Sequence, residues 1–205
     1  LQALGLQEGD KIALFADNSP RWFIADQGTI MAGAANAVRS AQADSEELLY
    51  ILENSDSSSL IVENLQTLAK LQPKVADLPL KFVILLSNET PKSDEPWQIF
   101  NFQQVMDLGA THSFQPPNPT QETLATLNYT SGTTGKPKGV MLSHGNLLHQ
   151  VNSLTTIIQP LPGDRALSIL PSWHSYERSC EYFLLAHGAT LFYSSIRNFK
   201  NDIKT

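Results

Sequence analysis

Short apolar runs alternate along the chain with stretches in which apolar residues recur at helical spacing. Residues 11–16 (KIALFA), 59–62 (SLIV) and 80–86 (LKFVILL) have the length and the nearly continuous apolar character of buried strands. Polar residues that favour helix starts stand between these runs. We therefore expect a first helix that begins at Ser19-Pro20 and ends near residues 33–37, and a second that begins at Ser45. Two further helices are expected over residues 65–71 and 102–108.

The same alternation continues after a proline-rich stretch, FQPPNPT, at residues 114–120. A helix should run from Ser143 to about Ile158, and another from about Ser175 to His187, where Gly188 is a typical helix stop. Strands are expected at residues 124–129, 140–142, 166–170 and 189–193.

Strands that alternate with helices are typical of a mostly parallel sheet covered by helices, so the predicted fold class is α/β. The proline-rich stretch favours a division of the chain. We expect a first, partial α/β subdomain over residues 1–113, a linker over 114–123, and the start of a second α/β subdomain over 124–205.

Composition and charge argue against several classes of function but do not identify one. The 205 residues carry a formal net charge of −6 and no block of Lys or Arg, which argues against nucleic acid as a partner. No apolar run approaches the roughly 20 residues that a membrane-crossing helix needs. Cys180 is the one cysteine, so no intramolecular disulfide can form, and a reducing, intracellular compartment is the simplest interpretation.

The candidate chemistry lies in residues 129–144, YTSGTTGKPKGVMLSH. Glycines let a loop bring its backbone close to a ligand, and hydroxyl and ammonium groups donate hydrogen bonds to it. Such a collection indicates an anionic ligand, with a phosphate chain as the first candidate. The donors are the hydroxyls of Thr130, Ser131, Thr133 and Thr134 and the ammonium groups of Lys136 and Lys138.

Two standard phosphate-binding motifs are excluded. A Walker A loop needs a glycine and a lysine five and six positions after its first glycine, but Pro137 stands five positions after Gly132. Lys136 is followed by proline rather than by Ser or Thr, and no G-x-G-x-x-G spacing occurs. A Gly/Ser/Thr-rich hairpin loop without a ligand is the alternative interpretation.

The segment from Tyr129 to Gly139, YTSGTTGKPKG, resembles the signature of the adenylate-forming superfamily, with every constrained position filled. This superfamily contains acyl-CoA synthetases, peptide-synthetase adenylation domains and luciferases. Residues 9–33 are similar to the family's opening strand and first helix, and LPSWHSYERS at 170–179 resembles its long-chain fatty-acid branch. Residues 33–57 and 182–193 look closest to acyl-acyl-carrier-protein synthetases of the plastid and cyanobacterial type.

The resemblance implies a two-step reaction. A carboxylate attacks the α-phosphate of ATP to give an acyl-adenylate and pyrophosphate, and a thiol then displaces AMP to leave a thioester. The implied substrates and cofactors are a fatty acid, ATP, Mg²⁺, and the thiol of CoA or of an acyl carrier protein's phosphopantetheine. The implied compartment is the cytoplasm or the plastid stroma, and peripheral membrane association stays open.

The resemblance also assigns residues. Lys138, which would follow the leaving pyrophosphate, and His174 are the expected catalytic residues. Trp173 and His174 are expected to line the acyl pocket. Thr130 matches the family position associated with Mg²⁺, whose carboxylate ligand is expected beyond Thr205. The expected ATP and phosphate contacts are Thr130, Ser131, Gly132, Thr133, Thr134, Gly135, Lys136, Lys138 and Gly139.

Structural interpretations stand beside these assignments. His174 could be a surface histidine bonded within its own loop, and Trp173 could be a core residue. Glu177 and Arg178 are either an active-site pair or, at least as readily, groups that cap a helix or offset its dipole, since adjacent helical side chains point in different directions. Tyr129 is expected to pack its strand, and Cys180 to be a small buried apolar residue.

Three functions are compatible with the sequence. The first is an ATP-dependent fatty-acid ligase that forms a thioester with CoA or with an acyl carrier protein. The second is adenylation of another carboxylate, such as an aryl or amino acid. The third is a nucleotide-binding remnant without catalysis, because the chain is expected to be an N-terminal fragment that lacks the family's C-terminal domain.

Overall fold

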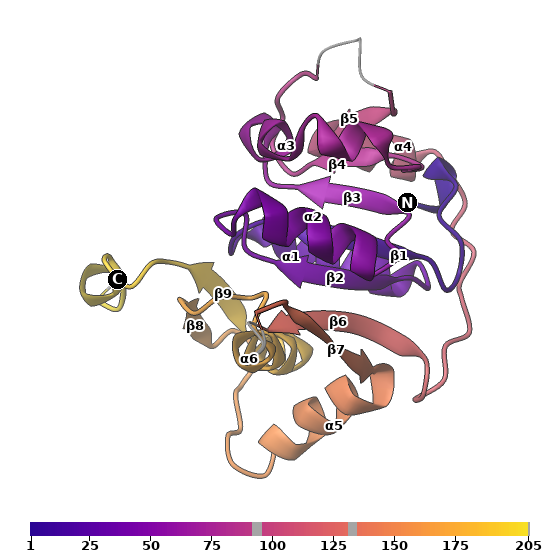
Figure 1. Ribbon diagram of the computed structural model, residues 1–205. Coiled ribbons are helices and arrows are strands. Elements are labelled where there is room, and N and C mark those ends of the chain that lie inside the picture. Colours follow the sequence, from indigo (N-terminus) through magenta and orange to yellow (C-terminus); the bar gives the residue numbers. More distant parts are fainter. Residues whose placement is uncertain (92–95, 131–134, 205) are drawn as a thin grey trace.

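A single mixed sheet organises most of the chain in the computed structural model, which describes residues 1–91, 96–130 and 135–204 (Figure 1). Within those residues its seven strands lie in the order β5-β4-β3-β1-β2-β6-β7. Neighbouring strands run parallel except for the antiparallel pair β6–β7. The strands are β1 Lys11–Phe15, β2 Ala35–Arg39, β3 Ser59–Val62, β4 Val83–Leu85, β5 Ile99–Asn101, β6 Leu124–Thr130 and β7 Lys138–Ser143.

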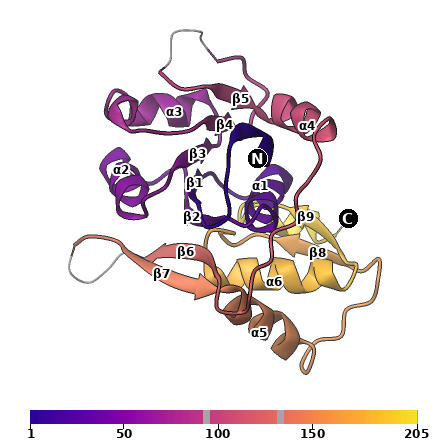
Figure 2. The same cartoon turned by 90° about the vertical axis from the view of Figure 1, so that its right-hand side faces the viewer.

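Helices cover both faces of this sheet, as Figure 2 shows, so the predicted α/β fold with a mostly parallel sheet is confirmed. On one face lie α2 (Ser45–Asn54) and α3 (Leu65–Leu71), and on the other lie α1 (Pro20–Met31) and α4 (Phe102–Ala110). Short 3₁₀ turns span Gln2–Leu4 (η1) and Lys74–Asp77 (η2).

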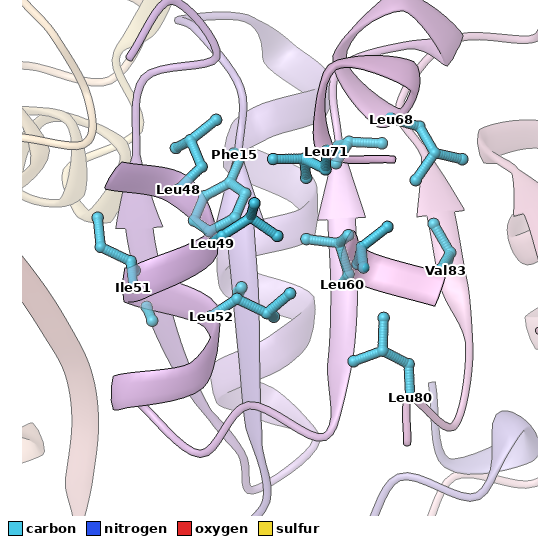
Figure 3. Packing of buried hydrophobic residues seen from close by; sticks show 14 of the residues in the cluster. Phe15, Leu48, Leu49, Ile51, Leu52, Leu60, Leu68, Leu71, Leu80 and Val83 are labelled. Carbon is cyan, nitrogen blue, oxygen red and sulfur yellow. The ribbon is translucent and has the colours of Figure 1, made fainter. Parts of the chain in front are cut away.

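The central strand β1 supplies side chains to both layers of the core, because successive residues of a strand point to opposite faces. Phe15 lies beside Leu48 of α2 in the cluster of Figure 3, which also contains Leu68 of α3. Leu14 packs instead in the cluster that contains Trp22 of α1. This burial on both faces explains why the strand is an unbroken apolar run rather than an alternating one.

Helix starts follow the predicted capping chemistry. The Ser19 hydroxyl accepts a hydrogen bond from the backbone N–H of Trp22 at 3.0 Å, and Pro20 is the first helical residue. Ser143 and Asn146 form a reciprocal capping box at the start of α5 (His144–Leu154). Each cap satisfies backbone donors that the first helical turn leaves unpaired.

Two strands lie where the sequence predicted none. β2 (Ala35–Arg39, ANAVR) occupies the region in which the first helix was expected to end, and its small, partly polar residues carry no strong strand signal. It forms because the chain turns at Gly33, whose φ of +84° favours glycine, and because β1 and β6 flank it. β5 is a three-residue edge strand, too short for its pattern to be distinguished.

A second, smaller sheet follows. β8 (Arg165–Ser168) and β9 (Thr190–Tyr193) pair in parallel and are joined by α6 (Ser175–Ala186), and α7 spans Phe199–Asp202. β6 and β7, which the sequence assigns to the second subdomain, extend the large sheet, since Thr126 pairs with Asn36 of β2. The proposed division at residues 114–123 stays a prediction.

Candidate functional site

The glycine- and hydroxyl-rich segment leaves the carboxyl end of β6. Thr130 is the last residue of that strand, is exposed, and pairs with Lys138, the exposed first residue of β7. The predicted contacts Ser131, Gly132, Thr133 and Thr134 lie outside the described residues. Among the described residues of this segment, Gly135 has a φ of +92°, which favours glycine.

Two neighbours of the segment set its local packing. Tyr129 is buried and its hydroxyl donates a hydrogen bond to Asn54 Oδ1 at 2.8 Å, as expected for a residue that packs its strand. Burial, with smaller contributions from Tyr50 and Asp56, raises the pKa of Tyr129 to about 12. A Cβ on Gly139 would lie 3.0 Å from the ring of Tyr129, so a larger residue there would require the ring to shift. The phenol therefore acts as a support of the hairpin.

The two lysines have different surroundings. The Lys136 ammonium lies 5.4 Å from the ring centroid of Tyr50, a cation–π contact that holds it against α2. Lys138 is exposed at the start of β7. Both positions leave ammonium groups near the end of β6, where an anionic ligand would meet positive charge.

His174 and Trp173 lie in the loop between β8 and α6. His174 caps α6: its Nδ1 accepts from the backbone N–H of Tyr176 at 3.5 Å, and its side chain is exposed. Trp173 is half-buried, packs against the core cluster of α1, and has the Arg39 guanidinium 4.9 Å from its ring centroid. An exposed imidazole beside an indole is compatible with binding a carboxylate that carries an apolar chain.

Side chains from two strand ends of the large sheet hold this loop. Asn18, just after β1, accepts from the Ser172 backbone N–H at 2.7 Å and donates to the Leu170 carbonyl. Arg39, the last residue of β2, stacks on Trp173 and pairs with Glu47 at 2.7 Å. β1, β2 and β6 are parallel neighbours, so their carboxyl ends lie at the same edge of the sheet. The loop of Trp173 and His174 contacts this edge, and Thr130 lies there as the last residue of β6. Ligands of α/β folds bind at this carboxyl edge.

A buried polar cluster joins α6 to α1, β2 and β6. Arg178 of α6 is 1% exposed, and its guanidinium donates to Thr126 Oγ1 at 2.7 Å, to Asn36 Oδ1 at 2.9 Å, and to Asp26 Oδ1. Burial alone would lower the pKa of Arg178, but Asp26 and the Tyr182 hydroxyl outweigh it and raise that pKa. We refer to this set as the Arg178 cluster; its further members are Asn128 and Tyr182.

The Arg178 cluster was not predicted from the sequence. Glu177 and Arg178 do not pair with each other: Glu177 Oε1 accepts from the Ile169 backbone N–H at 3.1 Å, whereas Arg178 pairs with Asp26. One sequence signal pointed to Asp26. It stands at helical spacing between the buried Trp22 and Thr29, so a carboxylate occupies the buried stripe of α1.

Magnesium is not accounted for by these side chains. Thr130 offers one hydroxyl, and no group of three or more His, Cys, Asp or Glu side chains that could hold a metal occurs among the described residues. Mg²⁺ requires near-octahedral oxygen coordination. The described residues therefore do not form a Mg²⁺ site by themselves.

An apolar cavity of about 480 Å³ lies elsewhere, between α1 and α4. Ile24, Met31, Phe102 and Met106 are among its lining residues, whereas Trp173 and His174 are not. This cavity is separate from the candidate site. Across residues 1–91, 96–130 and 135–204, no helix has the length and apolar character needed to cross a membrane.

Comparison with known proteins agrees with this geometry. The chain is 40% identical over 221 residues to probable acyl-activating enzyme 16, chloroplastic, of Arabidopsis thaliana, and 39% identical over 221 residues to the Arabidopsis long-chain-fatty-acid–[acyl-carrier-protein] ligase AEE15, chloroplastic. Each match covers 100% of this chain and 30% of the relative, so the chain spans less than a third of those proteins.

Among solved structures, the adenylation domain of a carboxylate reductase from Mycobacterium chelonae superposes with a TM-score of 0.83. It is 19% identical and the match covers 98% of this chain and 34% of that one, a likeness that shows the fold. The family model described as AMP-binding enzyme matches residues 1–205. The resemblance inferred from the segment at 129–139 is thereby confirmed, and the chain belongs to the AMP-binding enzyme family.

Proposed function

We propose that the full-length protein activates a long-chain fatty acid with ATP and transfers the acyl group to the thiol of an acyl carrier protein. One observation carries the proposal: the glycine- and hydroxyl-rich segment begins at Thr130, on the sheet edge at which Asn18 and Arg39 hold the loop of Trp173 and His174. The relative AEE15, named as a long-chain-fatty-acid–[acyl-carrier-protein] ligase, supports this choice of acid and acceptor.

In the first step, a carboxylate oxygen forms a bond to the α-phosphorus of ATP, and the bond to the bridging oxygen of the β-phosphate breaks. Negative charge accumulates on the leaving pyrophosphate. Donors already aimed at that charge lower the barrier without reorganising. We assign this role to the hydroxyl and backbone N–H groups of residues 130–135 and to the ammonium groups of Lys136 and Lys138, with Gly139 allowing close approach.

We assign binding of the fatty acid to the loop of Trp173 and His174. His174 would orient the carboxylate for attack, because its exposed imidazole caps a helix whose N-terminus favours negative charge. The Trp173 indole would contact the first part of the acyl chain. Thr130 would contribute one oxygen to a Mg²⁺ ion whose other ligands come from outside the described residues.

In the second step, a thiolate sulfur bonds to the acyl carbonyl carbon and AMP leaves with the electrons of the acyl–oxygen bond. The two similar Arabidopsis proteins are named chloroplastic, and this supports the plastid stroma as the compartment. CoA as the acceptor and peripheral association with a bilayer are the alternatives for the full-length protein.

The test is fatty-acid-dependent exchange of label between pyrophosphate and ATP, measured on the full-length protein without any thiol. We expect exchange with long-chain fatty acids, followed by transfer to acyl carrier protein rather than to CoA when each thiol is offered. Exchange with only an aryl or amino acid would overturn the choice of substrate. A folded protein that binds ATP but exchanges with no acid would be a non-catalytic binding module.

A further inference from the structure

Arg178 is connected to both halves of the candidate site. On the α6 side, its backbone N–H donates to the carbonyl of His174 at 3.2 Å, so it lies one helical turn after the proposed carboxylate-orienting residue. Because the Arg178 side chain projects from the first turn of α6, its bonds to the sheet also restrain the backbone of that turn against movement. His174, as the residue that precedes this turn, would move with it.

On the sheet side, Arg178 is bonded to the strand that ends at the phosphate-binding segment. Its Nη1 donates to Thr126 Oγ1 at 2.7 Å and to Asn128 Oδ1 at 3.2 Å. Successive side chains of a strand alternate between faces, so positions 126, 128 and 130 share one face of β6. Thr130 is thus two residues beyond the last contact of Arg178 on the same strand.

The remaining partners fix the guanidinium in both position and plane. Nη2 donates to Asp26 Oδ1 of α1 and to Asn36 Oδ1 of β2 at 2.9 Å, and Nε donates to the Tyr182 hydroxyl at 3.0 Å. Asp26 in turn accepts from Asn36 Nδ2 at 2.6 Å. A planar fork with five donors can meet acceptors on four elements at once, which a lysine ammonium cannot.

Energetics argue that this arrangement serves alignment more than stability. A buried ion pair recovers little more than its own desolvation cost, and apolar side chains of similar volume often hold a core equally well. Apolar packing, however, tolerates small shifts of a helix along a strand. A guanidinium bonded to fixed acceptors permits only one register of α6 against β6.

We propose that Arg178 is a positioning residue: with Asp26 it aligns the His174 end of α6 with the Thr130 end of β6. The acid and ATP then meet in a reactive orientation. This inference rests on the proposed function, since it assigns a role within acyl-adenylate formation. Loss of Arg178 is therefore expected to slow the reaction without weakening substrate binding, because each loop keeps its own contacts to its own substrate.

The test uses two variants of the full-length protein. Arg178→Lys retains the charge and loses the fork, whereas Arg178→Met combined with Asp26→Leu removes both charges and places apolar side chains beside the remaining polar members of the cluster, Asn36, Thr126, Asn128 and Tyr182. A matched control is Arg21→Lys. Arg21 lies on α1, as Asp26 does. Its guanidinium lies 4.6 Å from the Phe102 ring centroid and donates a hydrogen bond to the Leu86 carbonyl at 2.6 Å. It is not part of the Arg178 cluster.

For each variant, thermal unfolding reports the fold and pyrophosphate exchange reports kcat and the KM values for ATP and fatty acid. We expect both variants to fold and to lose roughly tenfold to a hundredfold in kcat, because a misplacement of about 1 Å can cost that much. The two KM values should change little, and the Arg21→Lys control should match the unmodified protein.

Two results would overturn the proposal. One is a folded variant with unchanged kcat. The other is loss of folding in both variants, which would assign the Arg178 cluster to stability alone. Absence of exchange in the unmodified protein with every acid would instead contradict the proposed function, so the two failures can be told apart.

Discussion

Single side chains of this molecule divide into exposed ones for which we propose a role in binding and buried ones that hold a loop in place. Lys138 is of the first kind, since it is exposed at the start of β7 and pairs in register with Thr130. Glu181 is of the second kind. It is 1% exposed, and its Oε1 accepts from the hydroxyls of Ser168 and Ser172 at 2.7 Å each.

Replacing Lys138 should affect the reaction and not the fold. An exposed side chain contributes little to unfolding free energy, whereas a lost donor to a developing charge costs on the order of a hundredfold in rate. We therefore expect Lys138→Ala to lower the rate of pyrophosphate exchange by that order while the melting temperature is unchanged. Lys74→Ala, which changes an exposed lysine in η2, is the control. Equal turnover of the two variants would remove Lys138 from the mechanism.

Glu181 predicts a dependence of stability on pH. Burial raises the pKa of Glu181 from its ordinary 4.5, and its bonds to Ser168 and Ser172 only partly oppose this. The folded chain then binds the proton more tightly than the unfolded chain, so stability falls as pH rises from about 4.5 through the raised pKa. Its Oε2 is buried with no hydrogen-bond partner among the described residues, which adds to the cost of ionisation.

The variant Glu181→Gln keeps an oxygen that can accept from both serine hydroxyls but cannot ionise. Urea unfolding at a series of pH values measures the difference in unfolding free energy between this variant and the unmodified protein. We expect that difference to shift in favour of Glu181→Gln as pH rises above about 4.5, because only the unmodified protein must then ionise a buried carboxyl. A difference that is constant with pH would contradict the assignment.

Among the secondary-structure elements, the hairpin of β6 and β7 depends on close packing between its two strands. Gly139 of β7 lies against the Tyr129 ring of β6, and that ring is held in place by its hydrogen bond to Asn54 of α2. The glycine- and hydroxyl-rich residues 131–137 follow β6 and precede β7 in the sequence. The placement of the two hairpin strands therefore depends on α2, an element far earlier in the chain, since Tyr129 and Asn54 are 75 positions apart.

Two glycine substitutions should have opposite effects on stability. Gly139→Ala would place a Cβ 3.0 Å from the Tyr129 ring and should cost about 1–3 kcal/mol of unfolding free energy. Gly28→Ala, inside α1 with nothing within 4 Å of the added Cβ, should stabilise by about 0.5–1 kcal/mol. Chemical unfolding of both variants checks the pair. Loss of stability in Gly28→Ala, or none in Gly139→Ala, would contradict the packing described.

In the molecule as a whole, two sheets meet along one helix. β8 and β9 pair only with each other among the described residues, and α6 joins them in the chain while its Arg178 is bonded to the large sheet. Asn18 and Arg39 add contacts from the ends of β1 and β2 to the loop of Trp173 and His174. The candidate site is therefore an assembly of strand ends, which agrees with where α/β folds bind ligands.

The fold class, most helix starts and the family to which the chain belongs could be predicted from the amino-acid sequence alone. The apolar periodicity, capping residues such as Ser19 and the contiguous residues 129–139 are local features, and each can be recognised within a short window. The strand β2 could not be predicted in this way, because its ANAVR sequence becomes a strand through pairing with β1 and β6.

Which distant residues meet could be known only from the folded chain. Arg178 and Asp26 are 152 positions apart, and nothing in the local pattern around Arg178 indicated that its partner lay in the first helix. Their pairing follows from the strand order and from the placement of α6 over β6, which arise when long-range burial outweighs local preference. A buried charge is stable only when it is paired, and the partner of Arg178 is brought close by the packing of the whole chain.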